Sequence, residues 1–298
     1  MSLDCMDIAK CLLETTAFSF GPVIAIASAR HGQKQWIKCE ILMSMVMGLI
    51  FYIKPEMFLS LVLNSTQKDY HNFLCMMYGF YIIYSVLVPL FHLESMDKSI
   101  FYGHHCSKVV SSTLLILNDV ISYNQGVHWN ENLLCLFTGY HLVSLVINLH
   151  FLRIGDKPWG RHPYTDKVDA IARIDSFIYL IAGVFVYAFP EKAMLDLTEM
   201  NESYTALGRS CAAILLSLSL ESYCLSEFLF LGDKKKFMHA RMVGSLVKAL
   251  VIVHANLYWK ILSLNSFLVL FTINAAYNLV VVYGFLVTPK EPKQKSSD

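Results

Sequence analysis

Eight apolar stretches, each close to the length needed to cross a bilayer, dominate this sequence. A helix needs roughly 20 such residues to cross about 30 Å of hydrocarbon. No stretch alternates with a period of two, and each exceeds the roughly 10 residues of a membrane β-strand. We therefore predict an all-α polytopic membrane protein whose eight transmembrane helices cover residues 36–53, 72–93, 107–123, 133–152, 170–189, 206–231, 238–259 and 265–287.

Composition supports a membrane protein and excludes one class of partner. Hydrophobic residues make up 55% of the chain, charged residues 16%, and mean hydropathy is +0.48. These values lie outside the range of ordinary soluble domains. The net charge of +1 provides no basic field to attract nucleic acid, so no nucleic-acid partner is expected.

The segment before these helices, residues 8–30, is a poor membrane span. It contains Lys10, Glu14 and a Gly21-Pro22 break. It also lacks a basic region ahead of its apolar part, so a removable signal peptide is not expected. We predict that residues 1–35 form a separate N-terminal segment that either lies at the membrane interface, re-enters the membrane or forms a ninth span.

An internal repeat organises the rest of the chain. A shift of 135 positions places residues 38–56 on 173–191, and a shift of 134 places the Leu-Phe-Thr of 136–138 on that of 270–272. The first alignment pairs Lys38 with Arg173, Glu40 with Asp175, Gly48 with Gly183, Tyr52 with Tyr187, and Pro55-Glu56 with Pro190-Glu191. We predict four-helix repeats at 36–152 and 170–287, joined by a linker at 153–169 and followed by a tail at 288–298.

The two Pro-Glu dipeptides have a structural and a functional interpretation. Proline lacks an N–H and disfavours helix in the preceding residue, so Pro55 and Pro190 are expected to end the preceding helices and to start short amphipathic turns. The functional alternative is a lumenal collar formed by the two equivalent loops.

The basic residues predict an orientation. An even number of helices returns each repeat to its starting side, so both repeats should share one orientation. Of the 24 basic residues, 18 then fall on one side and only four, Lys54, Lys68, Lys192 and Lys260, on the other. By the positive-inside rule the start of repeat 1 and the C-terminus are expected to be cytosolic.

Two glycosylation motifs agree with this orientation. Asn64 in Asn-Ser-Thr and Asn201 in Asn-Glu-Ser both follow the first helix of a repeat. Both loops are lumenal by the charge distribution, and the lumen is where an acceptor asparagine is glycosylated. We predict a glycoprotein of the endoplasmic reticulum membrane.

The second repeat carries features of a known family. Its first helix ends in "AFPE", and after a loop its second helix opens with "LGRSCAAILLSLSL". In these features residues 168–287 resemble the family of tumour protein p53-inducible protein 11 and, more broadly, small DoxX-like four-helix membrane proteins. The resemblance implies a four-helix fold and topology and no functional residue. The tandem duplication departs from that single-unit pattern.

Ionisable and polar residues inside the predicted spans are the candidates for function. Each has a free-energy cost in hydrocarbon unless it is paired with another group or hydrated. Glu221 and Lys248 are predicted to form an ion pair between adjacent antiparallel helices. The pair serves either a polar pathway or headgroup site, or only the register of the helices. The further candidates are Arg209, Glu227, His254 and Asn256.

Histidine and cysteine patterns point to no cofactor. The chain lacks the clustered histidine boxes of membrane diiron enzymes, and its histidines show no repeated pairing suited to haem. The eight cysteines form no CxxC motif. No catalytic, cofactor-binding or metal-binding residue is therefore predicted, and an enzyme is not expected.

Two basic cytosolic segments are candidate docking surfaces for anionic lipid or a larger protein, although positive-inside charge alone explains most of their composition. Their candidate residues are Trp159 and Arg161 in the linker, and Lys234, Lys235 and Lys236. The function expected from the sequence is a non-enzymatic accessory or scaffold subunit of a larger endomembrane complex, with membrane lipids and a larger membrane or membrane-anchored protein as partners. The alternative is a transporter or lipid carrier that uses the cleft between the repeats with Glu221 and Lys248.

Overall fold

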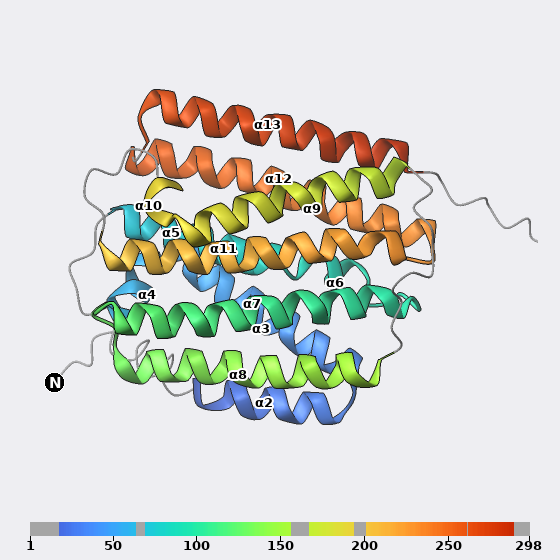
Figure 1. Ribbon diagram of the computed structural model, residues 1–298, viewed down its shortest axis with the longest axis horizontal. Helices are drawn as coiled ribbons and strands as arrows, with labels where there is room; N and C mark the ends of the chain where they lie inside the picture. The colour runs from blue at the N-terminus through green and yellow to red at the C-terminus, as the bar shows by residue number, and fades with distance from the viewer. Residues whose placement is uncertain (1–17, 64–68, 156–166, 194–200, 261, 289–298) are drawn as a thin grey trace, which may run out of the picture.

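A computed structural model describes residues 18–63, 69–155, 167–193, 201–260 and 262–288. Within them the chain forms long helices that run back and forth along one common axis (Figure 1). The long helices are α3 (Gln33–Ile53), α5 (Asp69–Tyr84) with its continuation α6 (Leu87–Phe91), α7 (Lys98–Asn124), α8 (Glu131–Ile154), α9 (Lys167–Ala188), α11 (Glu202–Tyr223), α12 (Leu231–Trp259) and α13 (Leu264–Val287). The short ones are α2 (Phe18–Arg30), α4 (Pro55–Val62), α10 (Pro190–Ala193) and the 3-10 turn η2 (Cys224–Glu227).

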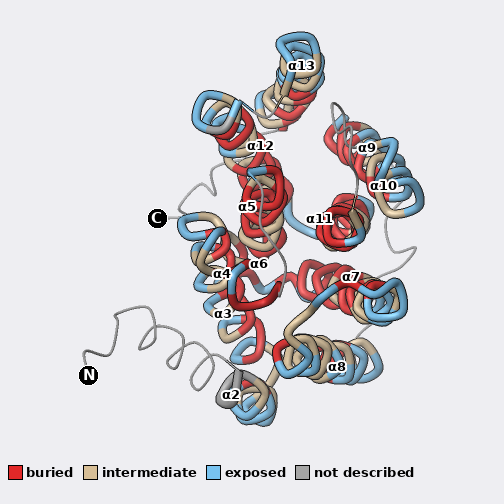
Figure 2. Tube along the Cα trace, turned by 90° about the vertical axis from the view of Figure 1, so that its left-hand side faces the viewer, coloured by how far each residue is buried: buried red, intermediate tan, exposed pale blue. Residues whose placement is uncertain are grey.

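The predicted all-helical architecture is confirmed for the described residues. Six helical segments are long and apolar enough to cross a membrane: α3, α5 with α6, α8, α9, α12 and α13. Helices α7 and α11 fall short of that standard, although both correspond to predicted spans. Both carry several serines and other polar residues on their buried faces, and α11 is buried along most of its length (Figure 2).

The polarity of α7 and α11 reflects their position in the core. Helix α11 packs against α9 on one side and α7 on another, and also touches α5. Most of its residues are buried, including Ser217, Ser219 and Ser222. The outer helices α9 and α13 instead expose large apolar side chains such as Phe177 and Leu279. Polar residues therefore face protein and apolar residues face outward, as expected for a bundle surrounded by lipid.

Local signals in the sequence explain where the helices begin and end. The side chains of Asp97, Asn130, Asn201 and Ser263 accept hydrogen bonds from backbone N–H groups at the starts of α7, α8, α11 and α13. The two Pro-Glu dipeptides follow the ends of α3 and α9 and open α4 and α10. Their predicted role as helix stops and helix starts is confirmed.

Small residues allow the helices to approach closely. A Cβ placed on Gly48 of α3 would lie 2.7 Å from the carbonyl oxygen of Gly79 in α5, and one on Gly183 of α9 would lie 2.6 Å from the Leu216 side chain of α11. On α12, a Cβ at Gly244 would lie 2.1 Å from the Tyr84 ring. Glycine at these positions lets adjacent helices pack at short range.

The N-terminal helix α2 lies alongside α8 rather than across the bundle (Figures 1 and 2). It packs against α3 and α8, and its Ala25 is buried in a cluster with Trp36 and Phe101. At 13 residues its length is about 20 Å, which is too short to cross a bilayer. Residues 8–17 of the predicted segment lie outside the described residues, and its placement relative to a membrane stays a prediction.

Most basic residues of the described chain gather at one end of the bundle, where α3, α7, α9 and α12 begin. We call it the basic end. The count of 18 basic residues on the cytosolic side included Arg241, and this assignment is wrong. Arg241 lies ten residues inside α12 and is fully buried. Lys234 is also buried, and its Nζ lies 2.6 Å from Asp169 Oδ1. These two side chains are part of the core of the bundle.

Candidate functional site

Five ionisable side chains from five helices form a connected set in the interior of the bundle. We call Glu40 of α3, His104 of α7, Glu221 of α11, Arg241 of α12 and Asp175 of α9 the buried charge network. Each is at most 3% exposed. Acid and base alternate along it, which provides every charged group with an oppositely charged or hydrogen-bonding neighbour, as burial requires.

His104 occupies the centre of one half of this network. Its Nε2 lies 2.9 Å from Glu40 Oε2, and its Nδ1 lies 3.3 Å from Glu221 Oε1. Only the protonated ring donates from both nitrogens, so the two carboxylates suit an imidazolium. Ser144 and Ser107 donate to Glu40 and Glu221 at 3.4 Å each.

Arg241 occupies the centre of the other half. Its Nε lies 3.4 Å from Asp175 Oδ2, and one terminal nitrogen lies 3.7 Å from Glu221 Oε2. The same nitrogen donates to the carbonyl oxygen of Leu218 and to Ser222 Oγ, each at 2.7 Å. Asp175 in turn accepts hydrogen bonds from Ser222 and from the hydroxyl of Tyr277.

Aromatic rings enclose the Arg241 guanidinium. The centroids of Phe237, Tyr84 and Tyr179 lie 4.9, 5.3 and 5.5 Å from its central carbon. Such rings attract a cation and exclude water. The Arg241 half of the network is therefore enclosed by aromatic rings, although the Arg241 Nε and Nη1 atoms and Glu221 Oε2 are buried without a hydrogen-bond partner among the described residues.

The predicted Glu221–Lys248 pair is wrong. Glu221 interacts with His104 and Arg241. Lys248 lies seven residues, or about two helical turns, beyond Arg241 on α12. Lys248 Nζ instead lies 4.6 Å from the centroid of Tyr277 and 5.9 Å from that of Tyr179. Helices α11 and α12 are consecutive in the chain but pack mainly on other helices, α11 on α9 and α7 and α12 on α13, so the prediction assigned Glu221 the wrong partner.

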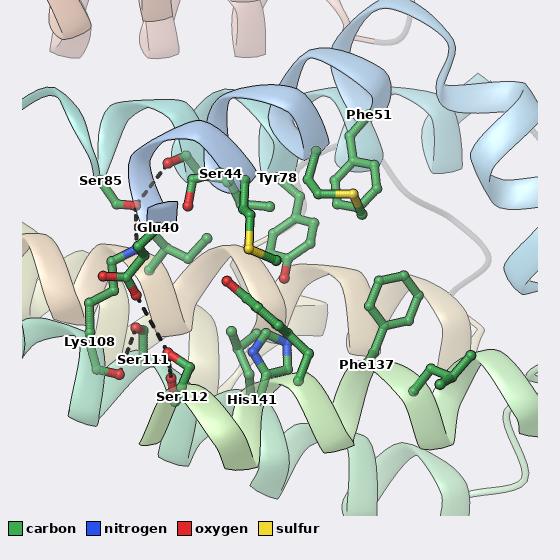
Figure 3. Close-up of a pocket in the computed structure, with 18 of the residues that line it drawn as sticks. Glu40, Ser44, Phe51, Tyr78, Ser85, Lys108, Ser111, Ser112, Phe137 and His141 are labelled. Atoms are coloured by element: carbon green, nitrogen blue, oxygen red, sulfur yellow. Dashed lines mark hydrogen bonds between the residues drawn. The ribbon is translucent and has the colours of Figure 1, made fainter. Parts of the chain in front are cut away.

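A first cavity lies among α3, α5, α7 and α8. It has a volume of about 110 Å³, and Pro22 of α2 and Ile214 of α11 complete its wall. Its lining is amphipathic: Glu40 and Lys108 lie with Ser85 and Ser112 at one side, and Phe51, Tyr78 and Phe137 at the other (Figure 3). Lys108 Nζ donates to Ser85 Oγ at 3.4 Å. The cavity thus combines a polar end with an aromatic end.

A second, larger cavity lies among α5, α9, α11, α12 and α13. Its volume is about 330 Å³ and its lining is mainly aliphatic and aromatic. Lys248 and Asn274 are the polar groups deep in its wall, and Tyr179 and Tyr277 lie beside them. Glu221 lines neither cavity. The second cavity lies between α5 of the first predicted repeat and the helices of the second, so the predicted cleft contains Lys248 but not Glu221.

The other predicted intramembrane residues are dispersed. Arg209 contacts the ends of α9 and α7, because its Nη1 donates to Gln125 Oε1 at 3.1 Å and its Nε to the Tyr187 carbonyl oxygen at 3.4 Å. Glu227 is buried in η2 at the basic end. His254 is exposed with its ring near Tyr258, and Asn256 accepts from Leu262 N at 3.3 Å. None of these four joins the buried charge network.

The predicted glycosylation and docking residues are only partly described. Asn201 caps α11 by accepting from Tyr204 N at 3.0 Å, and Asn64 lies outside the described residues. Of the docking residues, Lys236 is exposed, Lys235 lies 5.2 Å from the Phe285 ring centroid, and Lys234 is buried against Asp169. Trp159 and Arg161 lie outside the described residues. Lys234 is thus unsuited to a docking surface.

Sequence reasoning missed most of the network. The alignment of Glu40 with Asp175 was a usable signal, because two acids at the same place in two apolar helices need partners. His104, next to His105, was considered only as part of a histidine box, and Arg241 was counted among the basic residues of the cytosolic side. In the part of the chain that the structure describes, no three His, Cys, Asp or Glu side chains are grouped so that they could hold a metal ion.

Comparison with known proteins places the chain in a family without assigning it an activity. No curated protein and no solved structure matches the chain significantly. A family profile described as a domain of unknown function, DUF8292, matches residues 38–286. This match covers all the long helices apart from the first turn of α3 and the last residue of α13. The chain therefore belongs to the DUF8292 family.

Proposed function

We propose that this chain is a multi-pass membrane protein of eight spans, arranged as two four-helix repeats of the same orientation. We propose that it binds lipid-like amphiphiles in two cavities, one lined mainly by repeat 1 and one by repeat 2 together with α5. Repeat 1 comprises α3, α5 with α6, α7 and α8; repeat 2 comprises α9, α11, α12 and α13. The observation that carries the proposal is that corresponding positions of the two repeats line the two cavities.

The correspondence extends to each helix of the repeat. On the first helices, cavity-lining positions 43, 44, 47 and 51 correspond to 178, 179, 182 and 186, each 135 positions later. On the fourth helices, lining positions 136 and 140 correspond to 270 and 274 by the shift of 134. The second helices add 78 and 82 with 211 and 215 at a shift of 133, and the third add 111 and 115 with 248 and 252 at a shift of 137. A shared architecture inherited by duplication accounts for this agreement.

Contacts between the repeats follow the same two-fold pattern. Helix α11, the second of repeat 2, packs on α7, the third of repeat 1; α5, the second of repeat 1, packs on α12, the third of repeat 2. The charge network repeats as well, since Glu40 with His104 corresponds to Asp175 with Arg241. Because α7 and α11 lie alongside long apolar helices over much of their length, we propose that they also cross the membrane.

Orientation and location are part of the proposal. We propose that the basic end faces the cytosol, in accord with the positive-inside rule. We further propose residence in the endoplasmic reticulum, with Asn201 at the lumenal end. The charge network near the basic end then acts as a clamp between the repeats, because its ion pairs join α3 and α7 to α9, α11 and α12.

Lipid binding follows from where the cavities lie and what lines them. Each lies between apolar helices and combines a wide apolar wall with a lysine, Lys108 or Lys248. Small-molecule sites typically pair an apolar wall with a few placed polar groups. A molecule that fills such a site from the bilayer has an apolar chain and a polar head. A lipid carrier or lipid receptor is the function we favour.

The accessory-subunit function expected from the sequence stays a prediction. Purification in gentle detergent followed by size-exclusion chromatography tests it, because a stoichiometric large partner would migrate with the protein. Lipid binding and membership of a complex are compatible, so such a partner would add to the present proposal.

Lipid photolabelling in cells tests the proposed function. Cells expressing the protein would be fed a diazirine-containing fatty acid that enters the lipid pool, irradiated, and the labelled peptides sequenced. We expect labelling of cavity-lining residues such as Tyr78, Phe137, Cys211 and Ile252. Labelling confined to outward-facing residues such as Leu42 and Val46, which are 65% and 49% exposed, would contradict the proposal.

A further inference from the structure

The second cavity is lined by a lysine, Lys248, that forms no ion pair with the described residues. Among the described residues, no carboxylate lies within ion-pair distance of Lys248. Its ammonium group instead lies over the ring faces of Tyr277 and Tyr179. The neighbouring acid, Asp175, is already bound by Arg241, Ser222 and Tyr277. An intramembrane lysine in this position is costly unless an anion or water joins it.

Asn274 provides a second, independent sign that a polar group is bound here. Its side chain is buried, with 4% of the residue exposed, and lines the same cavity as Lys248. Neither its Nδ2 nor its Oδ1 has a hydrogen-bond partner among the described residues. A buried amide without partners costs free energy comparable to a lost hydrogen bond. A ligand head that accepts from Lys248 and Asn274 would satisfy both groups at once.

The cavity is open to the side of the bundle. Near the basic end α9 and α13 touch: a Cβ on Gly284 would lie 2.9 Å from Ile171, and Tyr277 bonds Asp175. Toward the opposite end they part, so that Ile178 and Ile273 both line the cavity and remain 39% and 62% exposed. In Figure 1 α9 runs obliquely away from α13 in that direction. The corresponding gap in repeat 1, between α3 and α8, is covered by α2.

The volume of the second cavity limits the size of its ligand. A cavity of about 150 Å³ accommodates one benzene, so 330 Å³ accommodates roughly a dozen heavy atoms. That is enough for an anionic head and the first part of one acyl chain, with the remainder extending between α9 and α13 into the bilayer. Two acyl chains and a large headgroup exceed it.

We propose that the second cavity binds a single-chain anionic amphiphile, with its carboxylate or phosphate between Lys248 and Asn274 and its chain leaving through the gap between α9 and α13. This inference rests on the proposed lipid-binding function and names its ligand class for repeat 2. The chemistry shared by a fatty acid and a lysophospholipid is a single chain ending in an anion.

The test is photolabelling of the full chain in phosphatidylcholine nanodiscs with two probes of equal chain length, a diazirine palmitate and its methyl ester. We expect the palmitate to label the α9, α11 and α13 lining, and Lys248→Met to reduce that labelling roughly tenfold or more, the loss of a charge-assisted bond. Lys248→Arg should retain most of it, and Lys236→Met, an exposed lysine outside the cavity, all of it. Unlabelled lysophosphatidate should compete with the probe, whereas inorganic phosphate should not.

The outcomes separate the two proposals. Equal labelling of the lining by both probes, insensitive to Lys248→Met, would overturn the anionic ligand and leave lipid binding intact. Competition by inorganic phosphate alone would assign the site to a free anion and also overturn it. Absence of labelling of either cavity by either probe would overturn the proposed function itself. Size-exclusion profiles of every variant establish that the compared proteins are folded.

Discussion

The first and second cavities share a backbone plan and differ in how their polar groups are satisfied. In the first, Lys108 bonds Ser85, Glu40 bonds His104, and α2 covers the side gap. In the second, Lys248 and Asn274 have no polar partner among the described residues, and the side gap is open. Similar helix packing can therefore produce one cavity whose polar groups bond one another and one cavity whose polar groups are suited to an external anion.

The largest expected effect comes from breaking the charge network at Arg241. Arg241→Met leaves Asp175 and Glu221 buried without their shared cation, so we expect a loss of about 3–5 kcal/mol in the free energy of unfolding in detergent. His104→Leu should cost less, because Arg241 also bonds the Leu218 carbonyl and Ser222.

The paired control for this prediction is the double variant Arg241→Met with Glu221→Gln, which removes one of the stranded charges. It should be more stable than Arg241→Met alone. If the single variants at Arg241 and His104 are both as stable as the parent protein, the network does not clamp the two repeats. Reversible denaturant unfolding in mixed micelles provides the measurement.

A smaller effect is expected where the repeats meet. Gly244 faces Tyr84 and the corresponding residue of repeat 1, Ser107, faces Glu221. Gly244→Ser should cost about 1–3 kcal/mol, because its Cβ would overlap the Tyr84 ring. Ser107→Gly should cost about 1 kcal/mol, from one weak hydrogen bond and added backbone freedom. Equal losses in the free energy of unfolding at both sites would show that the two interfaces do not differ in packing. Gly139→Ala is the neutral control, because nothing lies within 4 Å of the new Cβ.

Removal of α2 sharpens the comparison of the two cavities. Deleting residues 1–31 uncovers the gap between α3 and α8, so the diazirine methyl ester should label Phe137 and Tyr140 more strongly than in the full chain. Labelling of Cys211 and Ile252 in the second cavity should not change. An unchanged ratio of labelling between the two cavities would indicate that α2 does not close the first one.

The smallest effect is expected from Lys248→Met on stability without ligand. Lys248 has no ion-pair partner among the described residues, so its removal should change the midpoint of thermal unfolding little, or raise it. A marked loss of stability in lipid-free detergent would instead make Lys248 a structural residue. The same scan with added palmitate should stabilise the parent protein more than the variant.

The sequence predicted the helices better than their partners. Hydropathy located the long helices, and Pro55 and Pro190 marked the ends of α3 and α9, because these signals are local. The partners of Glu221 and the burial of Arg241 depend on how α7, α9, α11 and α12 rotate and pack, which residue spacing does not specify. Lys248 was singled out as a charge within an apolar helix, yet its setting among Tyr277, Tyr179 and Asn274 required the packed structure.

The most direct test of the central claim is a cryo-EM map of the full chain in nanodiscs made with native endoplasmic reticulum lipid. The account predicts elongated density in the second cavity, with its head between Lys248 and Asn274 and its tail between α9 and α13. It also predicts the corresponding arrangement of repeat 1 with α2 over the gap. A second cavity filled by protein side chains or collapsed, with α9 and α13 in contact along their full length, would contradict it.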